Sequence, residues 1–222
     1  MKKKEKDVVK NNRADVSEVL RNRIVEGIYL PGSKLNEQDL TLEFKISRPL
    51  AREILIDLES RGLVEKEPNK GAVVRRIDFN SLIEIMQVRE SLEGLAARLA
   101  AEKSDPSEWE ELSGKFGETI ERAVEENDLD TYFNLVSEFQ TKMFAAARNN
   151  ELSRLNDLIF TKMIIVQRRL IVLPGRMRLA MEEHRKVLKA IMDKEPEKAE
   201  LARRDNLRSA LNYYKKYSKW VL

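Results

Sequence analysis

The 222 residues are enough for two modest domains, and the mixture of 42% hydrophobic with 36% charged residues favours a soluble protein with solvated helix faces. The absence of cysteine excludes a disulfide framework and a thiol nucleophile, and no apolar run approaches the roughly 20 residues of a membrane helix, so we expect a cytoplasmic protein. The net charge of +3 is unevenly divided, because residues 1–76 carry 17 Lys and Arg against 13 Asp and Glu, which suits an N-terminal module facing nucleic acid.

The N-terminal third predicts three helices. Residues 1–12 are charged and contain too little apolar surface for a core, so we expect a flexible basic arm. Over Val16–Val25 the apolar residues recur at helical spacing, which predicts the first helix. Asn36 and Ser47 are residue types that cap helices, and they precede predicted helices at 37–44 and 48–60.

A change of period follows these helices. Leu63-Val64 and 72–74 are short β-type runs, and the turn signals of 67–71 lie between them, which predicts a hairpin with a basic tip. Three helices followed by a hairpin is the order of a winged helix-turn-helix. We assign this DNA-binding domain to residues 13–76 and a short linker to 77–80.

The rest of the chain, residues 81–222, has a helical pattern throughout and predicts an all-α bundle of about six helices for dimerisation and effector binding. Asp105-Pro106, Asn149-Asn150, Pro174-Gly175 and Glu195-Pro196 mark the breaks between helices. The fold class is therefore mainly α, with one small hairpin. The predicted helices are 79–103, 106–127, 129–149, 151–173, 176–193 and 197–219.

Two arginines at the start of the predicted helix 48–60 are suited to reading DNA. Arg48 and Arg52 are four residues apart and so share one helix face, and a guanidinium group matches guanine or a phosphate with two donors. The alternative is that both side chains are merely solvated, with Glu53 as a charge partner. The context of three helices and a hairpin favours the DNA-reading interpretation.

A set of residues spread over 16–76 strengthens this interpretation. They are Ile24-Val25-Glu26-Gly27, Leu30 to Glu37, Leu40, Ser47-Arg48, Arg52-Glu53, Leu58, Gly62-Leu63-Val64, Pro68 and Gly71. In this combination the segment resembles the N-terminal domain of the GntR family of bacterial regulators. Pro49 departs from the family pattern, which places its proline one position later, so base contacts near it are expected to differ. The resemblance implies DNA contacts by Gln38, Ser47, Arg48, Arg52 and Gly71, to which we add Lys70 for its charge.

The helical half resembles the FadR-type C-terminal domain of the same family, in its shorter form known as FCD. The motifs that carry this weaker resemblance are Val88 to Glu93, Ala96 to Ala100, Ala145 to Asn150, and Glu183-His184-Arg185 followed by Ala190-Ile191.

Relatives of this type hold a divalent metal with one Asp and three His. The resemblance puts these four positions at Ser137, Thr141, His184 and Asn206, and a slip of one residue would replace the first two by Val136 and Gln140. Only His184 survives as a usual ligand, and one imidazole with two hydroxyls and an amide is a poor site for a transition metal. We predict no metal and no cofactor.

Two interpretations of these polar residues remain open. In the first, Ser137, Thr141, His184 and Asn206 face a cavity and bind a small organic effector, whose carboxylate pairs with Arg89. In the second, the cavity has closed, His184 is hydrogen-bonded within the core, and Arg89 pairs with a nearby Glu.

We therefore predict a transcription regulator that binds double-stranded operator DNA with an inverted repeat as a homodimer, under control of a small effector, most simply a carboxylate. One alternative is a DNA-binding helical dimer that senses nothing. An enzyme is disfavoured, because the chain has one histidine, no phosphate-binding glycine loop and no Gly-x-Ser-x-Gly elbow.

Overall fold

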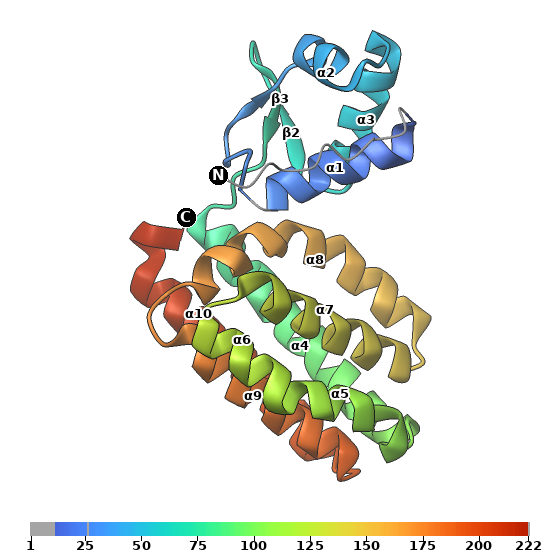
Figure 1. The fold of residues 1–222 in the computed structure, drawn as a ribbon, viewed down its shortest axis with the longest axis vertical. Coiled ribbons are helices and arrows are strands. Elements are labelled where there is room, and N and C mark those ends of the chain that lie inside the picture. Colours follow the sequence, from blue (N-terminus) through green and yellow to red (C-terminus); the bar gives the residue numbers. More distant parts are fainter. Residues whose placement is uncertain (1–11, 26, 222) are drawn as a thin grey trace. The chain divides into compact units, whose positions relative to one another are not determined.

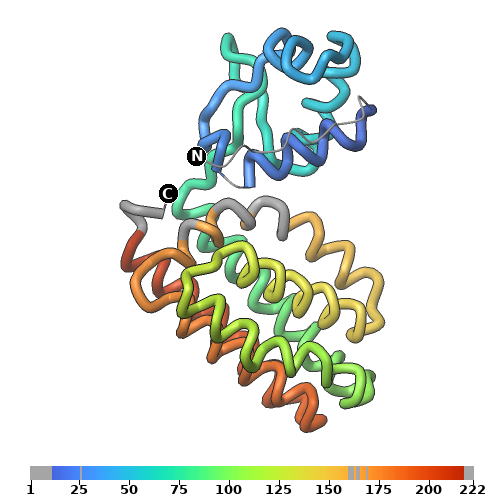
Figure 2. Tube along the Cα trace, viewed as in Figure 1, coloured from blue at the N-terminus to red at the C-terminus, as the bar shows by residue number. Residues whose placement is uncertain are grey.

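The computed structural model describes residues 12–25 and 27–221, apart from the side chains of 160–162, 164–165, 169 and 218–221. All but the last residue of the predicted basic arm lies outside the described residues. The chain divides into two compact units, Met1–Ile77 with Thr161–Arg168, and Asp78–Phe160 with Arg169–Leu222. Figures 1 and 2 show the elements of the two units, coloured along the sequence.

The N-terminal unit contains the predicted winged helix-turn-helix. Its helices are α1 (Arg13–Val25), α2 (Glu37–Phe44) and α3 (Arg48–Ser60), and its strands are β1 (Lys34–Leu35), β2 (Val64–Glu67) and β3 (Gly71–Val74). The strands form one antiparallel sheet in the order β1-β3-β2, in which Leu35 pairs with Ala72 and Lys66 also pairs with Ala72 from the other side. The sheet therefore has one strand more than the predicted hairpin.

The core of this unit follows from the helical spacing of its apolar residues. Leu20 and Ile24 of α1 are fully buried together with Ile54 and Leu58 of α3, and Val74 of β3 closes the cluster. Caps fix the two helices of the motif, because Asn36 accepts a hydrogen bond from the backbone of Gln38 and Ser47 accepts one from Leu50. The predicted starts of α2 and α3 are confirmed.

The second unit is helical, and α4 packs most extensively against α10, which in turn packs on α9. Gly94 of α4 lies at the contact with α10, close to the side chains of Arg204 and Glu200. The helical elements are α4 (Phe79–Lys103), η1 (Pro106–Trp109), α5 (Glu110–Gly114), η2 (Lys115–Thr119), α6 (Ile120–Glu126), α7 (Leu129–Ala146), α8 (Asn150–Ile171), α9 (Arg176–Met192) and α10 (Pro196–Val221).

The single helix predicted over 106–127 is wrong. A 3₁₀ turn, α5, a π-type turn and α6 replace it, and Gly117 has a non-helical ψ of −105°. Two of the backbone carbonyls at this kink receive hydrogen bonds from a neighbouring helix, because Arg185 of α9 donates to the oxygens of Phe116 and Gly117 at 2.6 and 2.9 Å. The glycine tolerates the non-helical backbone and the external donor satisfies the exposed carbonyl groups, so the break in the helix costs little free energy.

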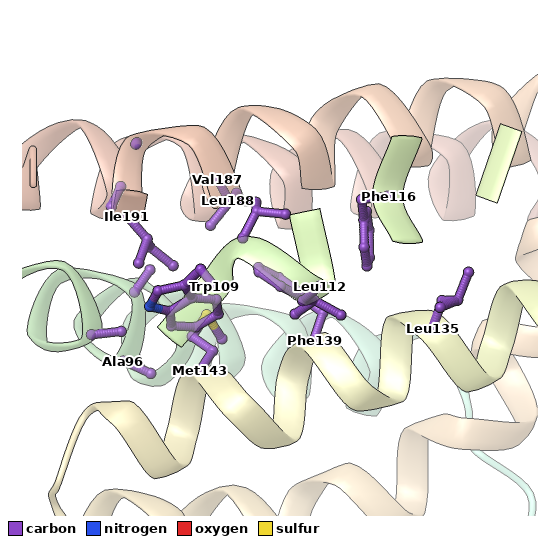
Figure 3. Close-up of a cluster of buried hydrophobic side chains, with 14 of the residues drawn as sticks. Ala96, Trp109, Leu112, Phe116, Leu135, Phe139, Met143, Val187, Leu188 and Ile191 are labelled. Carbon is purple, nitrogen blue, oxygen red and sulfur yellow. The ribbon is translucent and has the colours of Figure 1, made fainter. Parts of the chain in front are cut away.

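A dense aromatic core holds the helical unit together. Figure 3 shows Trp109 between residues of α9, including Val187 and Ile191, and residues of α7, including Phe139 and Met143. The indole nitrogen of Trp109 donates to Ser104 at 2.8 Å, so its one polar group is satisfied inside the core. Within the residues that the structure describes, none of the helices combines the length and apolar character that crossing a membrane requires.

Candidate DNA interface and effector site

The first turn of α3 presents two guanidinium groups to solvent. Arg48 and Arg52 are exposed on one face, while the opposite face of the helix is buried through Ala51, Ile54 and Leu58. Ser47 caps the helix, so its backbone N–H groups and positive dipole end lie beside these arginines. The arrangement offers donors to base edges and a helix terminus to a phosphate.

A carboxylate from the preceding helix orients one of the two arginines. Arg52 donates from Nε and Nη2 to the two oxygens of Glu37 at 2.9 and 3.1 Å, which fixes the plane of its guanidinium group. The hydrogen bond from Arg52 holds the pKa of Glu37 below its ordinary value. The alternative prediction of Glu53 as the charge partner is wrong, since Arg52 pairs with Glu37, while Arg48 has no ion-pair partner in the described part of the chain.

The wing supplies a second exposed feature. Asn69 and Gly71 both have positive φ angles, 64° and 81°, which give the tight turn between β2 and β3. Lys70 at the tip is exposed and pairs with Glu67 at 2.6 Å. A groove of about 410 Å³ runs between α3 and the wing, and Arg52 and Lys70 are among its lining residues. All six predicted DNA-contacting residues are exposed on this unit: Gln38, Ser47, Arg48, Arg52, Lys70 and Gly71.

The five predicted effector residues do not all come together. Ser137 and Thr141 are exposed on α7 and line a groove with residues of α8, so their expected position facing a common cavity with His184 is wrong. The physical reason is the phase of α7, which turns Phe139 and Gln140 inward in their place. Of the slipped pair, Gln140 is buried and Val136 packs against the core. The remaining three, Arg89, His184 and Asn206, are buried.

Arg89 and Asn206 belong to a continuous network of buried and half-buried polar side chains, here called the polar network, that crosses three helices. Arg89 of α4 donates to Glu93 at 2.7 Å, and Glu93 also accepts from Arg203 of α10 at 2.9 Å. Arg203 donates to Asn206 at 2.7 Å. Asn206 then donates to Glu183 of α9 at 2.7 Å, and Glu183 accepts from Arg176 at 2.8 Å.

The charges in this polar network shift the pKa values of neighbouring side chains. Burial opposes ionisation of Glu93, but the guanidinium groups of Arg203 and Arg89 outweigh it and hold the pKa of Glu93 below its ordinary value. Burial, reinforced by the positive charges of Arg203 and Arg176, lowers the pKa of His184 to about 3. His184 is therefore neutral, with Nδ1 donating to the backbone oxygen of Ala180 at 2.6 Å and the ring between Phe116 and Phe139.

Three buried polar atoms beside the polar network have no hydrogen-bond partner among the described residues. They are the hydroxyl groups of Tyr132 and Tyr214 and the Nε of Arg176. Burial raises the pKa of both tyrosines, against the opposing positive charge of Arg176 that acts on each of them. Because unpaired buried donors are rare in proteins, this cluster is a candidate ligand site.

The sequence prediction missed most of this site. The residues it missed are Glu93, Tyr132, Arg176, Glu183, Arg203 and Tyr214. One signal was available, because Glu93 stands four residues after Arg89 on a helix face that is otherwise apolar. The tyrosines carried no such signal, since an aromatic residue at helical spacing is ordinary core.

The donor set does not fit the divalent metal that the resemblance implies. Asn206 already uses its oxygen to accept from Arg203 and its nitrogen to donate to Glu183. The guanidinium groups of Arg203 and Arg176 act on the ring of His184 and would repel a cation there. Among the described residues there is no group of three or more His, Asp or Glu side chains able to hold a metal ion.

Comparisons with known proteins give a family match for each of the two units. The family profile "Bacterial regulatory proteins, gntR family" matches residues 12–74, and the profile of the FCD domain matches residues 84–209. The HTH-type transcriptional repressor RspR of Escherichia coli (strain K12) is 30% identical over 121 residues, which cover 54% of this chain and 53% of that repressor. The match thus spans about half the length of that relative.

Other relatives match over more of their length. The HTH-type transcriptional regulator YdhC of Bacillus subtilis (strain 168) is 28% identical over 185 residues, or 81% of this chain and 80% of that protein. Among solved structures, E. coli McbR/YncC has a TM-score of 0.77 at 22% identity and covers 92% of this chain and 98% of that one. A Rhodococcus sp. RHA1 regulator has a TM-score of 0.73 at 19% identity and covers 90% and 95%. At these identities the solved structures support the fold.

Proposed function

The chain belongs to the gntR family of bacterial regulatory proteins and carries an FCD domain, and on this premise we propose that a small carboxylate bound in the helical unit controls its affinity for an operator. The protein is a DNA-binding transcriptional regulator and not an enzyme.

The observation that carries the DNA-reading part is the exposed pair of guanidinium groups at the capped start of α3. In the proposed complex α3 lies in the major groove, where Arg48 and Arg52 reach base edges with two parallel donors each. Glu37 holds Arg52 in a fixed plane before DNA arrives, which lowers the entropy lost on binding. Lys70 at the wing tip contacts a phosphate.

We propose that two copies of the chain act together on an inverted repeat. A two-fold symmetric dimer presents two α3 helices. The spacing between the half-sites then follows from the distance between the two N-terminal units. The effector binds the dimer more tightly when the two N-terminal units are in one arrangement than when they are in another. Only such a difference in effector affinity shifts DNA binding.

The polar network that links Arg89 to Arg176 supports a carboxylate as the effector, since guanidinium groups pair with carboxylates in a fixed geometry. The second candidate is a DNA-binding helical dimer without sensing. It is favoured by the pairing of Arg89 with Glu93 and by the close packing of His184, which agree with the closed interpretation of the site.

The DNA-reading part is tested by selecting bound duplexes from a random pool and then measuring affinity for the selected sequence. We expect an inverted repeat, and we expect Arg48→Ala or Arg52→Ala to weaken specific binding by about 1–3 kcal/mol. Arg154→Ala is the matched control, because Arg154 is an exposed arginine of α8 that pairs only with Glu151 among the described residues. Unchanged operator affinity in both α3 variants would contradict this placement of the reading helix.

A further inference from the structure

We propose that Ile56 of α3 is a specificity-determining residue that contacts the 5-methyl group of a thymine in the operator. The contact requires α3 to lie in the major groove, so this inference rests on the proposed function. Three features of the N-terminal unit support it: the exposure of Ile56, its place on the helix, and the charge of the groove that it lines.

Ile56 is the exposed apolar residue of the reading helix. Of the large apolar side chains of α3, which the structure describes throughout, Ile56 alone is exposed, at 48%, whereas Ile54 and Leu58 are fully buried. A β-branched side chain adds little to a helix in solvent, because alanine, leucine and the long charged residues have higher helix propensities. Neither the core nor the stability of the helix therefore accounts for an isoleucine at this position.

The place of Ile56 on α3 brings it into line with the arginines. Arg48, Arg52 and Ile56 follow one another at intervals of four residues, so Ile56 continues the exposed face that Arg52 presents. Four residues of α-helix rise about 6 Å, which is close to the rise of about two base pairs of DNA. A helix in the major groove that brings Arg52 to one base edge therefore brings Ile56 to an edge about two base pairs away.

The groove between α3 and the wing has the charge of a DNA-binding surface. Ile56 lines this groove of about 410 Å³ together with four cationic side chains and two carboxylates, namely Lys34, Arg52, Lys66 and Lys70 with Glu37 and Glu59. The excess of positive charge favours a polyanion over an apolar protein partner. Because contacts from lysines to phosphates position DNA without distinguishing its bases, Ile56 is placed to add sequence information.

The chemistry of the base edges determines which group Ile56 contacts. In the major groove the four unmodified bases all offer hydrogen-bond donors or acceptors, and thymine alone adds an apolar methyl group. The side chain of Ile56 forms no hydrogen bond, so its favourable contact is with that methyl group. Burying one methyl group corresponds to about a fourfold change in affinity, which a binding assay resolves.

The test first removes the methyl group from the DNA. In the operator selected from random duplexes, each thymine in turn would be replaced by deoxyuridine in both half-sites, which deletes only the methyl group, and fluorescence anisotropy would measure the affinity of the full chain. We expect one replacement to weaken binding by about fourfold per half-site, about two base pairs from the position whose base preference is lost in Arg52→Ala. If no replacement weakens binding, the inference is overturned.

Ile56→Ala completes a double-mutant cycle. This variant should bind the thymine operator about fourfold or more weakly per half-site, and should bind the thymine and deoxyuridine operators equally. Its unfolding temperature should not fall, because the site is exposed and alanine favours the helix. Ile28→Ala is the matched control, since Ile28 is an isoleucine of the same unit, 55% exposed, outside both α3 and the groove. A variant Ile56→Ala that still distinguishes the two operators as the parent does would show that another residue contacts the methyl group.

The arginine variants separate this inference from the proposed function. If Arg48→Ala and Arg52→Ala weaken operator binding and no deoxyuridine replacement does, α3 reads the DNA and the role given to Ile56 is wrong. If neither arginine variant changes operator affinity, but a deoxyuridine effect that depends on Ile56 is present, the contact of Ile56 stands and the roles given to the arginines are wrong.

Discussion

Lys70 is the one lysine at the tip of the wing, and its exposed charge makes it a phosphate contact in the proposed complex. Lys70→Ala should weaken binding to specific and random duplexes alike and lower the slope of log affinity against log salt by about 1. Fluorescence anisotropy over a series of salt concentrations measures this slope. Lys186→Ala, an exposed lysine of α9, should leave it unchanged. A loss of affinity confined to the selected operator would show that Lys70 reads a base.

His184 should make the protein less stable in mild acid. Its folded-state pKa of about 3 lies below the ordinary value of 6.5, so the unfolded chain takes up the proton first and stability falls as the pH drops through 6.5. Between about pH 7 and about pH 5 this one residue should remove about 2 kcal/mol of unfolding free energy. Urea unfolding of the parent and of His184→Gln at both pH values measures the difference, which should disappear in the variant. Parallel loss in the two proteins would contradict the buried neutral ring.

At this scale the sequence predicted the exposure of the α3 arginines better than it predicted the positions of the residues proposed for effector binding. Arg48 and Arg52 were predictable because exposure and charge at a helix start are local properties, and the structure places both in solvent. Glu37 as the partner of Arg52 lies 15 residues away and depends on the angle between two helices. Tyr132 and Tyr214 were invisible because only packing shows that their hydroxyl groups lack partners.

Two helical glycines should respond oppositely to the same substitution. Gly114 is exposed in α5 and an added Cβ meets nothing within 4 Å, so Gly114→Ala should stabilise the protein by about 1 kcal/mol through helix propensity. A Cβ at Gly94 of α4 would lie 2.9 Å from the Cγ and Nε of Arg204, which is tied to Glu200. Overpacking should outweigh propensity there, with a net loss of about 1 kcal/mol. Chemical unfolding of both variants checks the signs, and a gain at Gly94 would mean that α10 yields easily.

Helix boundaries were predictable where a cap or a proline marked them. The prediction placed α4 at 79–103 and α3 at 48–60, as observed, because Asp78 and Ser47 are strong caps. The break within 106–127 was missed because the sequence around Gly117 has no proline and keeps its apolar spacing, and the external donor Arg185 lies 68 residues away. Strand β1 was missed because two residues form no pattern.

The whole molecule should show reciprocal coupling between its two ligands. If the proposed carboxylate effector changes operator affinity by some factor, then saturating operator must change carboxylate affinity by the same factor, because both describe one coupling free energy. Typical coupling of about 1–3 kcal/mol gives factors of about 5 to 150. Calorimetric titration of the acid with and without operator, beside anisotropy with and without acid, measures both. Unequal factors would show that one ligand acts at a second place on the protein.

The wing is very short, since only Pro68, Asn69 and Lys70 separate strands β2 and β3. In the proposed complex an N-terminal unit with so short a wing contacts few nucleotides beyond those under α3, so we expect one unit alone to bind DNA weakly. In the proposed dimer the second N-terminal unit then binds from an already tethered position, at an effective concentration on the order of millimolar. Occupancy therefore depends on both halves of the repeat at once, and a lone half-site elsewhere in a genome competes poorly for the protein.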